Sequence, residues 1–352
     1  MSSKTLFAGA AAVALAIGFA AAPTSDAEAQ ERLRWKLAST YPGSLPQLGT
    51  LGVRIEERLE EISDGAIRLR FYEPGALVPP LEVFDAVSEG SIEAAWSTPG
   101  YWVGKIPSAP LFSAVPFGPA AQEYIAWYYF GGGQELYEEI FGQFNIKPMI
   151  CGVIAPEASG WFKEPIESVE DLRGLKMRFF GLGAKVMEKM GASTQLIAGG
   201  DIYPALELGS IDATEFSMPA IDYNLGFYQV AKHYYLPGWH QQSTMFELLI
   251  NKDKWDTLDE QTQVMFETVC GDNVRYGIAE GEAIQIEALQ NIEDEGVTIH
   301  EWPDEILAQL EEAWLEVVEE EKAADEDFAR VWDSLSTFRE NYAQWRELGY
   351  LD

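Results

Sequence analysis

Three histidines, His233, His240 and His300, are the first residues to test for catalytic chemistry. None is accompanied by a G-x-S-x-G elbow, an H-E-x-x-H motif or a phosphate-binding P-loop, and a lone histidine without a partner motif is more often structural. The two cysteines, Cys151 and Cys270, lack metal-ligand spacing. The residue types therefore favour a binding protein over an enzyme.

The stretch LKMRFFGLGAKVMEKMGA, residues 175–192, predicts a strand, a glycine turn and a helix. A dinucleotide loop would begin in this way, but Val186 occupies the position where that motif needs its third small residue. Arg178 is more specific, because it lies at the end of the strand, where open α/β sheets bind their ligands. Its guanidinium can pair with a carboxylate through two parallel hydrogen bonds. A structural ion pair with one of the many glutamates is the open alternative.

Arg178 must be positioned by the surrounding elements, and an internal repeat predicts what they are. VFDAVSEGSIEAAWSTP from Val83 and IYPALELGSIDATEFSM from Ile202 align without gaps, and each predicts a helix, a glycine stop and a strand. The preceding segments also correspond, so each copy is predicted to be a strand-helix-strand-helix-strand unit. We expect two α/β lobes with mostly parallel sheets and a ligand cleft between them.

A long helical segment follows the second copy. It is predicted to begin near Thr257 as N-cap and to stop at Gly296, which is long enough to run along both lobes. A second helical segment, residues 303–348, closes the chain. Residues 301–327 contain twelve acidic residues and only one base, Lys322, a composition typical of a solvated helical face.

The first 29 residues resemble a secretory signal, with Lys4, an apolar run from residue 6 to 22 and AEA before the expected cleavage after Ala29. This predicts a mature protein outside the cytoplasm. An oxidising compartment permits disulfides. However, the apolar setting of Cys151 in PMICGVIAP predicts a buried thiol rather than a bridge to Cys270.

Charge excludes one class of partner. The chain has 57 acidic residues, 24 Lys and Arg residues and a formal net charge of −33. Such a field repels nucleic acid and anionic membranes, and it makes a local cation such as Arg178 necessary for an anionic ligand.

GGDIYPALELGSIDATEFSMP, KHYYLPGWHQ and LINKDKW, together with the stretch around Arg178, closely resemble the solute-binding subunit of TRAP transporters, the tripartite ATP-independent periplasmic carriers. The resemblance covers nearly the whole chain after residue 29, with the motifs in the family's order and spacing. It implies two α/β lobes of the periplasmic-binding-protein type, joined by a long helix and closing over a small organic acid, and a membrane permease as partner. In this family, Arg178 matches the arginine that binds the substrate carboxylate.

APEASGWF, IDATEF and PGWHQ resemble the branch that binds 2-oxo or 2-hydroxy monocarboxylates together with a metal ion. The resemblance implies that Glu157, Glu215, Gln241 and the carbonyl of Phe216 hold the cation, and Ca²⁺ or Na⁺ suits this all-oxygen set. Glutamate and glutamine are exchanged here between the positions of Glu157 and Gln241, and Phe216 replaces a tryptophan often seen in the branch. Because of these departures, the resemblance does not determine which ion and which acid are bound.

Glu157 and Phe216 are also expected to contact the substrate, and Tyr101 and Trp239 are candidates for the pocket wall, although most Tyr and Trp residues pack in cores. The predicted boundaries are residues 1–29 for the signal, 30–150 with 246–290 for lobe I, and 151–245 with 291–352 for lobe II and the C-terminal helices.

Two other functions stay open at this point: an exported metal-dependent enzyme acting on a carboxylate, and a sensor that presents its closed form to a membrane kinase. Relatives with long C-terminal helices can form dimers, so the resemblance also leaves a homodimer open.

Overall fold

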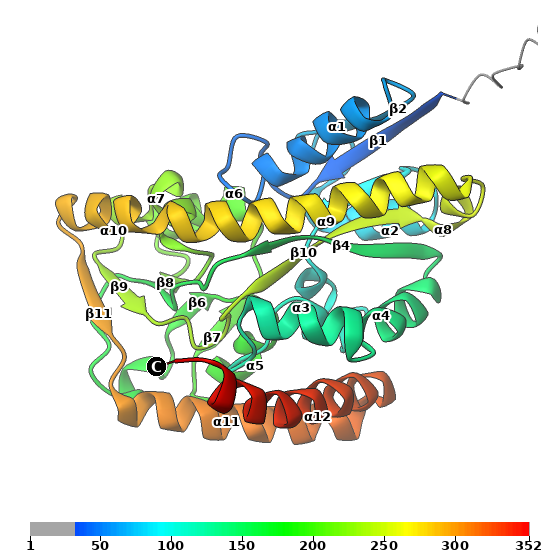
Figure 1. Ribbon diagram of the computed structural model, residues 1–352. Helices are drawn as coiled ribbons and strands as arrows, with labels where there is room; N and C mark the ends of the chain where they lie inside the picture. The colour runs from blue at the N-terminus through cyan, green and yellow to red at the C-terminus, as the bar shows by residue number, and fades with distance from the viewer. Residues whose placement is uncertain (1–31, 352) are drawn as a thin grey trace, which may run out of the picture. The chain divides into compact units, whose positions relative to one another are not determined.

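Two β-sheets organise the computed structural model, which describes residues 32–351 (Figure 1). The predicted signal segment, residues 1–29, lies outside the described residues. We call the first sheet and the helices packed on it the first lobe, and the second sheet with its helices the second lobe. Within residues 32–351, no helix combines the length and the apolar composition needed to cross a membrane.

The first sheet has five strands, and the second has six. In spatial order the first sheet consists of β2 (Ile67–Tyr72), β1 (Leu33–Ser39), β3 (Ala94–Ser97), β10 (Thr244–Asn251) and β4 (Ile146–Ile154). The second consists of β11 (Thr298–Glu301), β9 (His233–Leu236), β5 (Gly160–Phe162), β8 (Ala213–Thr214), β6 (Lys176–Arg178) and β7 (Ser193–Gln195).

The internal repeat is confirmed as a repeated topology. In the first copy, β1 pairs in parallel with both β2 and β3, and in the second copy β6 pairs in parallel with both β7 and β8. Gly90 and Gly209, the predicted stops, have φ of +75° and +74°, a left-handed conformation that glycine adopts without strain. The helices of the two copies are α1 (Thr50–Ile62) and α2 (Val83–Ser88), then α5 (Gly181–Lys189) and α6 (Gly199–Glu207).

Both sheets are mixed, whereas the sequence predicted mostly parallel ones. β10 runs antiparallel to β3 and β4, and β5 runs antiparallel to β8 and β9. These strands lie outside the repeat and lead from one lobe to the other: β4 continues into β5, and β9 continues into β10. A strand that arrives directly from the other lobe needs no crossover helix, so it can join the sheet in the antiparallel sense.

The long helical segment is confirmed as α9 (Glu260–Ala283) followed by α10 (Gln285–Asp294), which are separated only at Ile284. α9 packs on β4 and α1 of the first lobe, while α10 packs on α7 (Pro219–Leu225) of the second (Figure 1). The N-cap is Asp259 rather than Thr257. The Asp259 side chain accepts a hydrogen bond from the amide of Thr262, whereas Thr257 donates to the carbonyl of Lys254 in the preceding turn.

Cys151 and Cys270 form a disulfide, so the prediction of a buried thiol was wrong. Both residues are buried, as the apolar sequence around Cys151 indicated. Cys151 lies on β4 and Cys270 on α9, and these two elements pack directly against each other. The sequence separation of 119 positions between the two cysteines hides this proximity.

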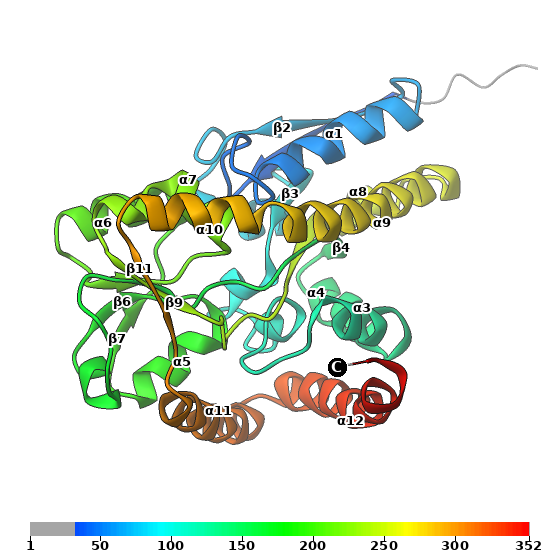
Figure 2. The same cartoon turned by 60° about the vertical axis from the view of Figure 1, so that its left-hand side comes forward.

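The acidic C-terminal segment forms α11 (Asp304–Ala324) and α12 (Glu326–Gly349), which lie along the bottom of the view in Figure 1. α11 packs on α5 of the second lobe, where Lys185 and Lys189 pair with Glu321, Glu316 and Glu320. α12 packs on α3 (Ala121–Phe130) and α4 (Gly133–Gly142) of the first lobe, as the turned view in Figure 2 also shows.

The exact residue boundaries of the two lobes stay a prediction. The remaining short helix, α8 (Lys252–Trp255), follows β10.

Candidate functional site

Arg178 lies at the end of β6 and is only 1% exposed. Its Nη1 donates to the carbonyl oxygen of Glu215 at 2.8 Å and to the Oε1 of Glu215 at 2.6 Å, and its Nε donates to the carbonyl of Ile197 at 3.2 Å. No hydrogen bond within residues 32–351 uses Nη2. The ion pair that the sequence left open is therefore present, and one edge of the guanidinium is still available to a ligand.

Three buried oxygens beside Arg178 have no hydrogen-bond partner within residues 32–351. They are Oε2 of Glu157, Oε2 of Glu215 and Oε1 of Gln241, and each residue is at most 3% exposed. The other oxygen of Glu157 accepts from Thr244 at 3.0 Å and from Ser217 at 3.4 Å. A buried polar atom without a partner costs about 1–3 kcal/mol. A group of three such oxygens indicates a site that a ligand completes.

His240 lies next to these carboxylates. Its Nε2 is 3.6 Å from Oε2 of Glu215 and 4.0 Å from Oε2 of Glu157, and neither ring nitrogen has a hydrogen-bond partner among the described residues. Ligand atoms of Glu157, Glu215 and His240 lie within 4.8 Å of one another, close enough to share one metal ion. The sequence patterns predicted a structural role for His240. The only local signal was its position directly before Gln241.

Burial and charge act in opposite directions on the two glutamates. Burial raises the pKa of Glu157 well above its ordinary value, and the neighbouring carboxylates of Glu215 and Asp222 raise it further. Burial also acts to raise the pKa of Glu215, but the charge of Arg178 and the nearby His240 outweigh it, so that pKa is lowered. Two carboxyl groups so close together are best accommodated by a further positive charge.

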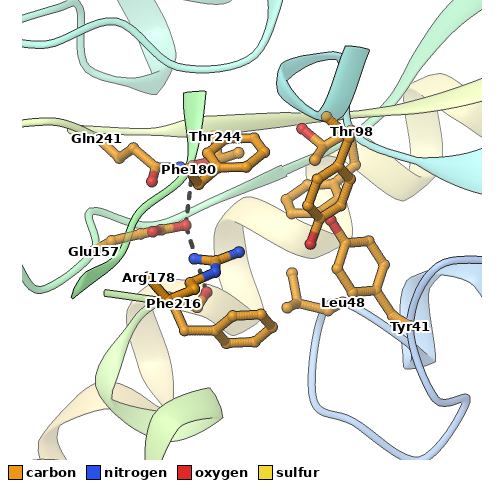
Figure 3. Close-up of a pocket in the computed structure, with 12 residues that line it drawn as sticks. Tyr41, Leu48, Thr98, Glu157, Arg178, Phe180, Phe216, Gln241 and Thr244 are labelled. Atoms are coloured by element: carbon orange, nitrogen blue, oxygen red, sulfur yellow. Dashed lines mark hydrogen bonds between the residues drawn. The ribbon is translucent and has the colours of Figure 1, made fainter. Parts of the chain in front are cut away.

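Arg178, Glu157 and Gln241 line a small cavity between the lobes, whereas Glu215 and His240 lie behind its lining (Figure 3). Its empty volume is about 250 Å³, including space that is open to solvent. Drug-sized ligands need cavities above about 300 Å³, so this one suits a molecule of a few heavy atoms. The lining residues are Tyr41, Leu48, Thr98, Tyr101, Glu157, Arg178, Phe180, Phe216, Ser217, Gln241, Thr244 and Phe246.

The two predicted wall residues differ in position. Tyr101 lines the cavity from the first lobe, while Trp239 lies outside the lining and packs in an aromatic cluster with Phe117 and Phe179, each at 5.8 Å between ring centroids. Trp239 does not line this cavity, because its ring is covered by aromatic neighbours distant in sequence. Cζ of the Arg178 guanidinium lies over the ring of Phe216, 5.1 Å from the ring centroid, which is a cation–π contact. Tyr41, for which no sequence pattern predicted a role, also lines the cavity.

Comparison with known proteins assigns this architecture to a family. Residues 37–325 match the DctP model, described as bacterial extracellular solute-binding protein, family 7. The chain belongs to this family. The predicted resemblance to TRAP solute-binding subunits is thereby confirmed, and the family consists of binding proteins rather than enzymes.

Individual relatives of this DctP-family protein carry informative ligands. A monocarboxylate 2-oxoacid-binding periplasmic protein of Nostoc sp. strain PCC 7120 is 33% identical over 321 residues, covering 91% of this chain and 87% of the relative. A TRAP solute-binding protein of Bordetella bronchiseptica shares 31% identity at a TM-score of 0.89, covering 91% of this chain and 95% of the other. It is a mixed-occupancy dimer with copurified calcium and picolinate in one site and an apo site. A protein of Pseudoalteromonas atlantica, with 30% identity, a TM-score of 0.87 and coverage of 91% and 97%, holds sodium and pyruvate.

In this DctP-family protein, the site is located where the lobes are joined. Glu157 lies in the segment between β4 and β5, and Gln241 lies in the segment between β9 and β10. The amide of Glu157 donates to the carbonyl of Gln241 at 3.1 Å, so the two connecting segments are tied together. Glu215 and Phe216 follow β8 in the second lobe. Residues distant in sequence are thus brought together by strand ends and lobe connections.

Proposed function

We propose that this protein is an extracytoplasmic receptor that captures a small 2-oxo or 2-hydroxy monocarboxylate together with a cation and delivers it to a TRAP permease. One observation carries the proposal: an unused guanidinium nitrogen of Arg178 lies beside three unpartnered buried oxygens. The carboxylate of an organic acid complements the guanidinium nitrogen, and a cation complements the three oxygens. The Nostoc relative and the pyruvate-binding neighbour support the same substrate class.

Each residue then has a defined role. Nη2 of Arg178 donates to the substrate carboxylate, and Glu215 holds the guanidinium in place through Nη1. Glu157, Glu215, Gln241 and the carbonyl of Phe216 would hold the cation, with His240 near enough to contribute. When bound, the cation supplies positive charge to these carboxylates and to the oxygens of the acid. Tyr101 and the Phe216 ring exclude water from the substrate.

The donor set favours a hard cation. Carboxylate, amide and carbonyl oxygens suit Ca²⁺ and Na⁺, and both ions are bound by the neighbours described above. Secretion through the first 29 residues would place the protein in the periplasm, the compartment of its Nostoc relative. Closure of the lobes over the acid would be a hinge motion at the connecting segments, and no bond would be made or broken.

Titration calorimetry with pyruvate, lactate and longer 2-oxo acids tests the proposal. Binding of one acid per protein, abolished by a chelator and restored by Ca²⁺ or Na⁺, is expected, and NMR should show the acid released unchanged. The absence of binding to every monocarboxylate tried would refute the substrate class. Turnover of the bound acid would instead support an enzyme.

The cation site has its own matched test. Glu157→Gln replaces a buried carboxyl group of the site by an amide, whereas Glu89→Gln makes the same replacement at an exposed position elsewhere. The first is expected to weaken Ca²⁺ binding about tenfold or more, because the carboxylate count determines the affinity of such sites. The second should have no effect. Equal Ca²⁺ affinities, measured by calorimetry without acid, would show that Glu157 is not a ligand.

A further inference from the structure

One side of the cavity is strongly polar, because Arg178, Glu157, Gln241, Ser217 and Thr244 line it. The other side is mostly apolar, although Thr98 and the hydroxyl groups of Tyr41 and Tyr101 also belong to the lining. If the proposed function is correct, the carboxylate and the 2-oxygen of the acid occupy this polar side. The alkyl substituent on the second carbon must then meet the remaining wall, to which the first lobe contributes the side chains of Tyr41, Leu48, Tyr101 and Phe246.

Most of this apolar wall is a set of aromatic rings that support one another. Between ring centroids, Tyr41 is 5.7 Å from Phe246 and 6.1 Å from Tyr101. The ring centroids of Tyr101 and Phe180 are 5.1 Å apart. Phe246 also stacks on Trp96 at 5.7 Å. Such contacts fix the rings independently of Leu48, which is the only aliphatic side chain in the lining. Removing the Leu48 side chain should therefore leave the aromatic wall in place.

The backbone of Leu48 is held rigidly. Its carbonyl accepts a hydrogen bond from the indole nitrogen of Trp96 at 2.6 Å, and its amide donates to the carbonyl of Pro46 at 2.6 Å. The next residue must be glycine, because a Cβ on Gly49 would lie 1.7 Å from the carbonyl oxygen of Pro42. Leu48 itself is 2% exposed. Its side chain is thus a fixed part of the wall and cannot move aside with a flexible loop.

In Figure 3, Leu48 lies between the rings of Phe216 and Tyr41, on the opposite side of the Arg178 guanidinium from Glu157. We propose that Leu48 is the specificity-determining residue that limits the length of the substituent on the second carbon of the bound acid. A methyl group, as in pyruvate, fits in front of Leu48, whereas a propyl or branched chain meets its side chain. The small free volume of the cavity supports this limit.

The test compares pyruvate with 2-oxovalerate by calorimetry at saturating Ca²⁺. Wild-type protein is expected to prefer pyruvate. Leu48→Ala should shift the ratio of the two dissociation constants toward 2-oxovalerate by about tenfold or more, because each newly accommodated methylene contributes about fourfold in affinity. Leu48→Val, which removes less volume, should give an intermediate shift and provides a test if the alanine variant does not fold.

Leu45→Ala is the matched control. Leu45 is a buried leucine of the same loop that does not line the cavity, so its replacement should lower thermal stability without changing the ratio. An unchanged ratio in both Leu48 variants would overturn the role of Leu48, and so would an equal shift in Leu45→Ala. If wild-type protein bound neither acid, the proposed function itself would fail, a result distinct from a failure of the Leu48 assignment.

Discussion

At the scale of single residues, Arg178 combines a structural and a binding role in one side chain. Nη1 is committed to Glu215, while Nη2 has no partner within residues 32–351. Leaving Glu215 buried without its partner would cost several kcal/mol, so replacement by alanine would confuse lost binding with lost stability. A replacement that keeps the positive charge separates the two roles.

We therefore predict that Arg178→Lys lowers the affinity for the acid about tenfold or more while the protein stays folded. A lysine ammonium can still pair with Glu215, but it lacks the planar fork that would reach both Glu215 and a carboxylate. Calorimetry and thermal melting measure the two effects. Arg173→Lys, at an exposed position, is the control. An unchanged affinity in Arg178→Lys would assign the carboxylate to another group.

Residue roles differed in how far the sequence could predict them. The position of Arg178 was predictable because a strand end before a glycine turn is a local pattern. The environments of Trp239 and His240 were not, because they depend on Phe179 and Glu215, which join them only through tertiary packing. The disulfide was missed for the same reason, since no local pattern reports that β4 and α9 are neighbours.

At the scale of elements, the repeat was predictable and the connections between the lobes were not. Each copy of the repeat is determined by helix stops and alternating patterns within one continuous segment, whereas the antiparallel placement of β5 and β10 follows from long-range pairing. β10 also carries a feature that no local pattern reveals. Its Glu247 is completely buried, accepts a hydrogen bond from Trp102 at 2.5 Å and is hydrogen-bonded to Tyr137.

Glu247 makes stability depend on pH. Burial raises its pKa to about 8, against the opposing effect of its hydrogen bonds to Tyr137 and Trp102. Between its ordinary value of 4.5 and about pH 8, the folded protein holds this proton and the unfolded chain does not. The free energy of unfolding should therefore fall as pH rises through this range, by up to about 1.4 kcal/mol per pH unit, and the contribution should level off above pH 8.

We predict that Glu247→Gln, which retains an acceptor for Trp102 and a donor for Tyr137, removes this contribution. The free energies of unfolding of the variant and the wild type, measured with urea at pH 5, 7 and 9, should be similar at pH 5. Toward pH 8 the variant should become increasingly more stable than the wild type. Glu89→Gln controls for the loss of one acid at an exposed site. If the wild type instead became more stable than the variant as pH rises, Glu247 would be ionised and stabilising in the folded protein.

At the scale of the whole molecule, the candidate site lies on the segments that connect the two lobes. Glu157 and Gln241 belong to the two segments that join the sheets, and Glu215 belongs to the second lobe. A cation held by these residues would act at the pivot, while the acid would contact Arg178 on one side and the aromatic wall of the first lobe on the other. The two ligands would then favour the closed arrangement together, because each contacts groups from different lobes or connections.

The net charge of −33 surrounds this site with a repulsive field, and it has a consequence for stability. Mutual repulsion of the carboxylates opposes the compact state, and salt screens it. We predict that KCl and choline chloride raise the melting temperature alike at pH 7, by about 3 °C for every 2 kcal/mol of repulsion relieved. At pH 4.5, where about a third of the carboxylates lose their charge, the effect should shrink.

Comparison of salts then separates the general field from the specific site. Screening depends on ionic strength, so potassium and choline should act equally, whereas a cation that binds Glu157, Glu215 and Gln241 stabilises by mass action at much lower concentration. An additional increase with NaCl or CaCl₂ that disappears in Glu157→Gln would report occupation of the site. If choline chloride failed to raise the melting temperature at pH 7, ion pairs such as those of Lys189 with Glu316 and Glu320 would already offset the repulsion, and the acidic surface would not limit the stability of the fold.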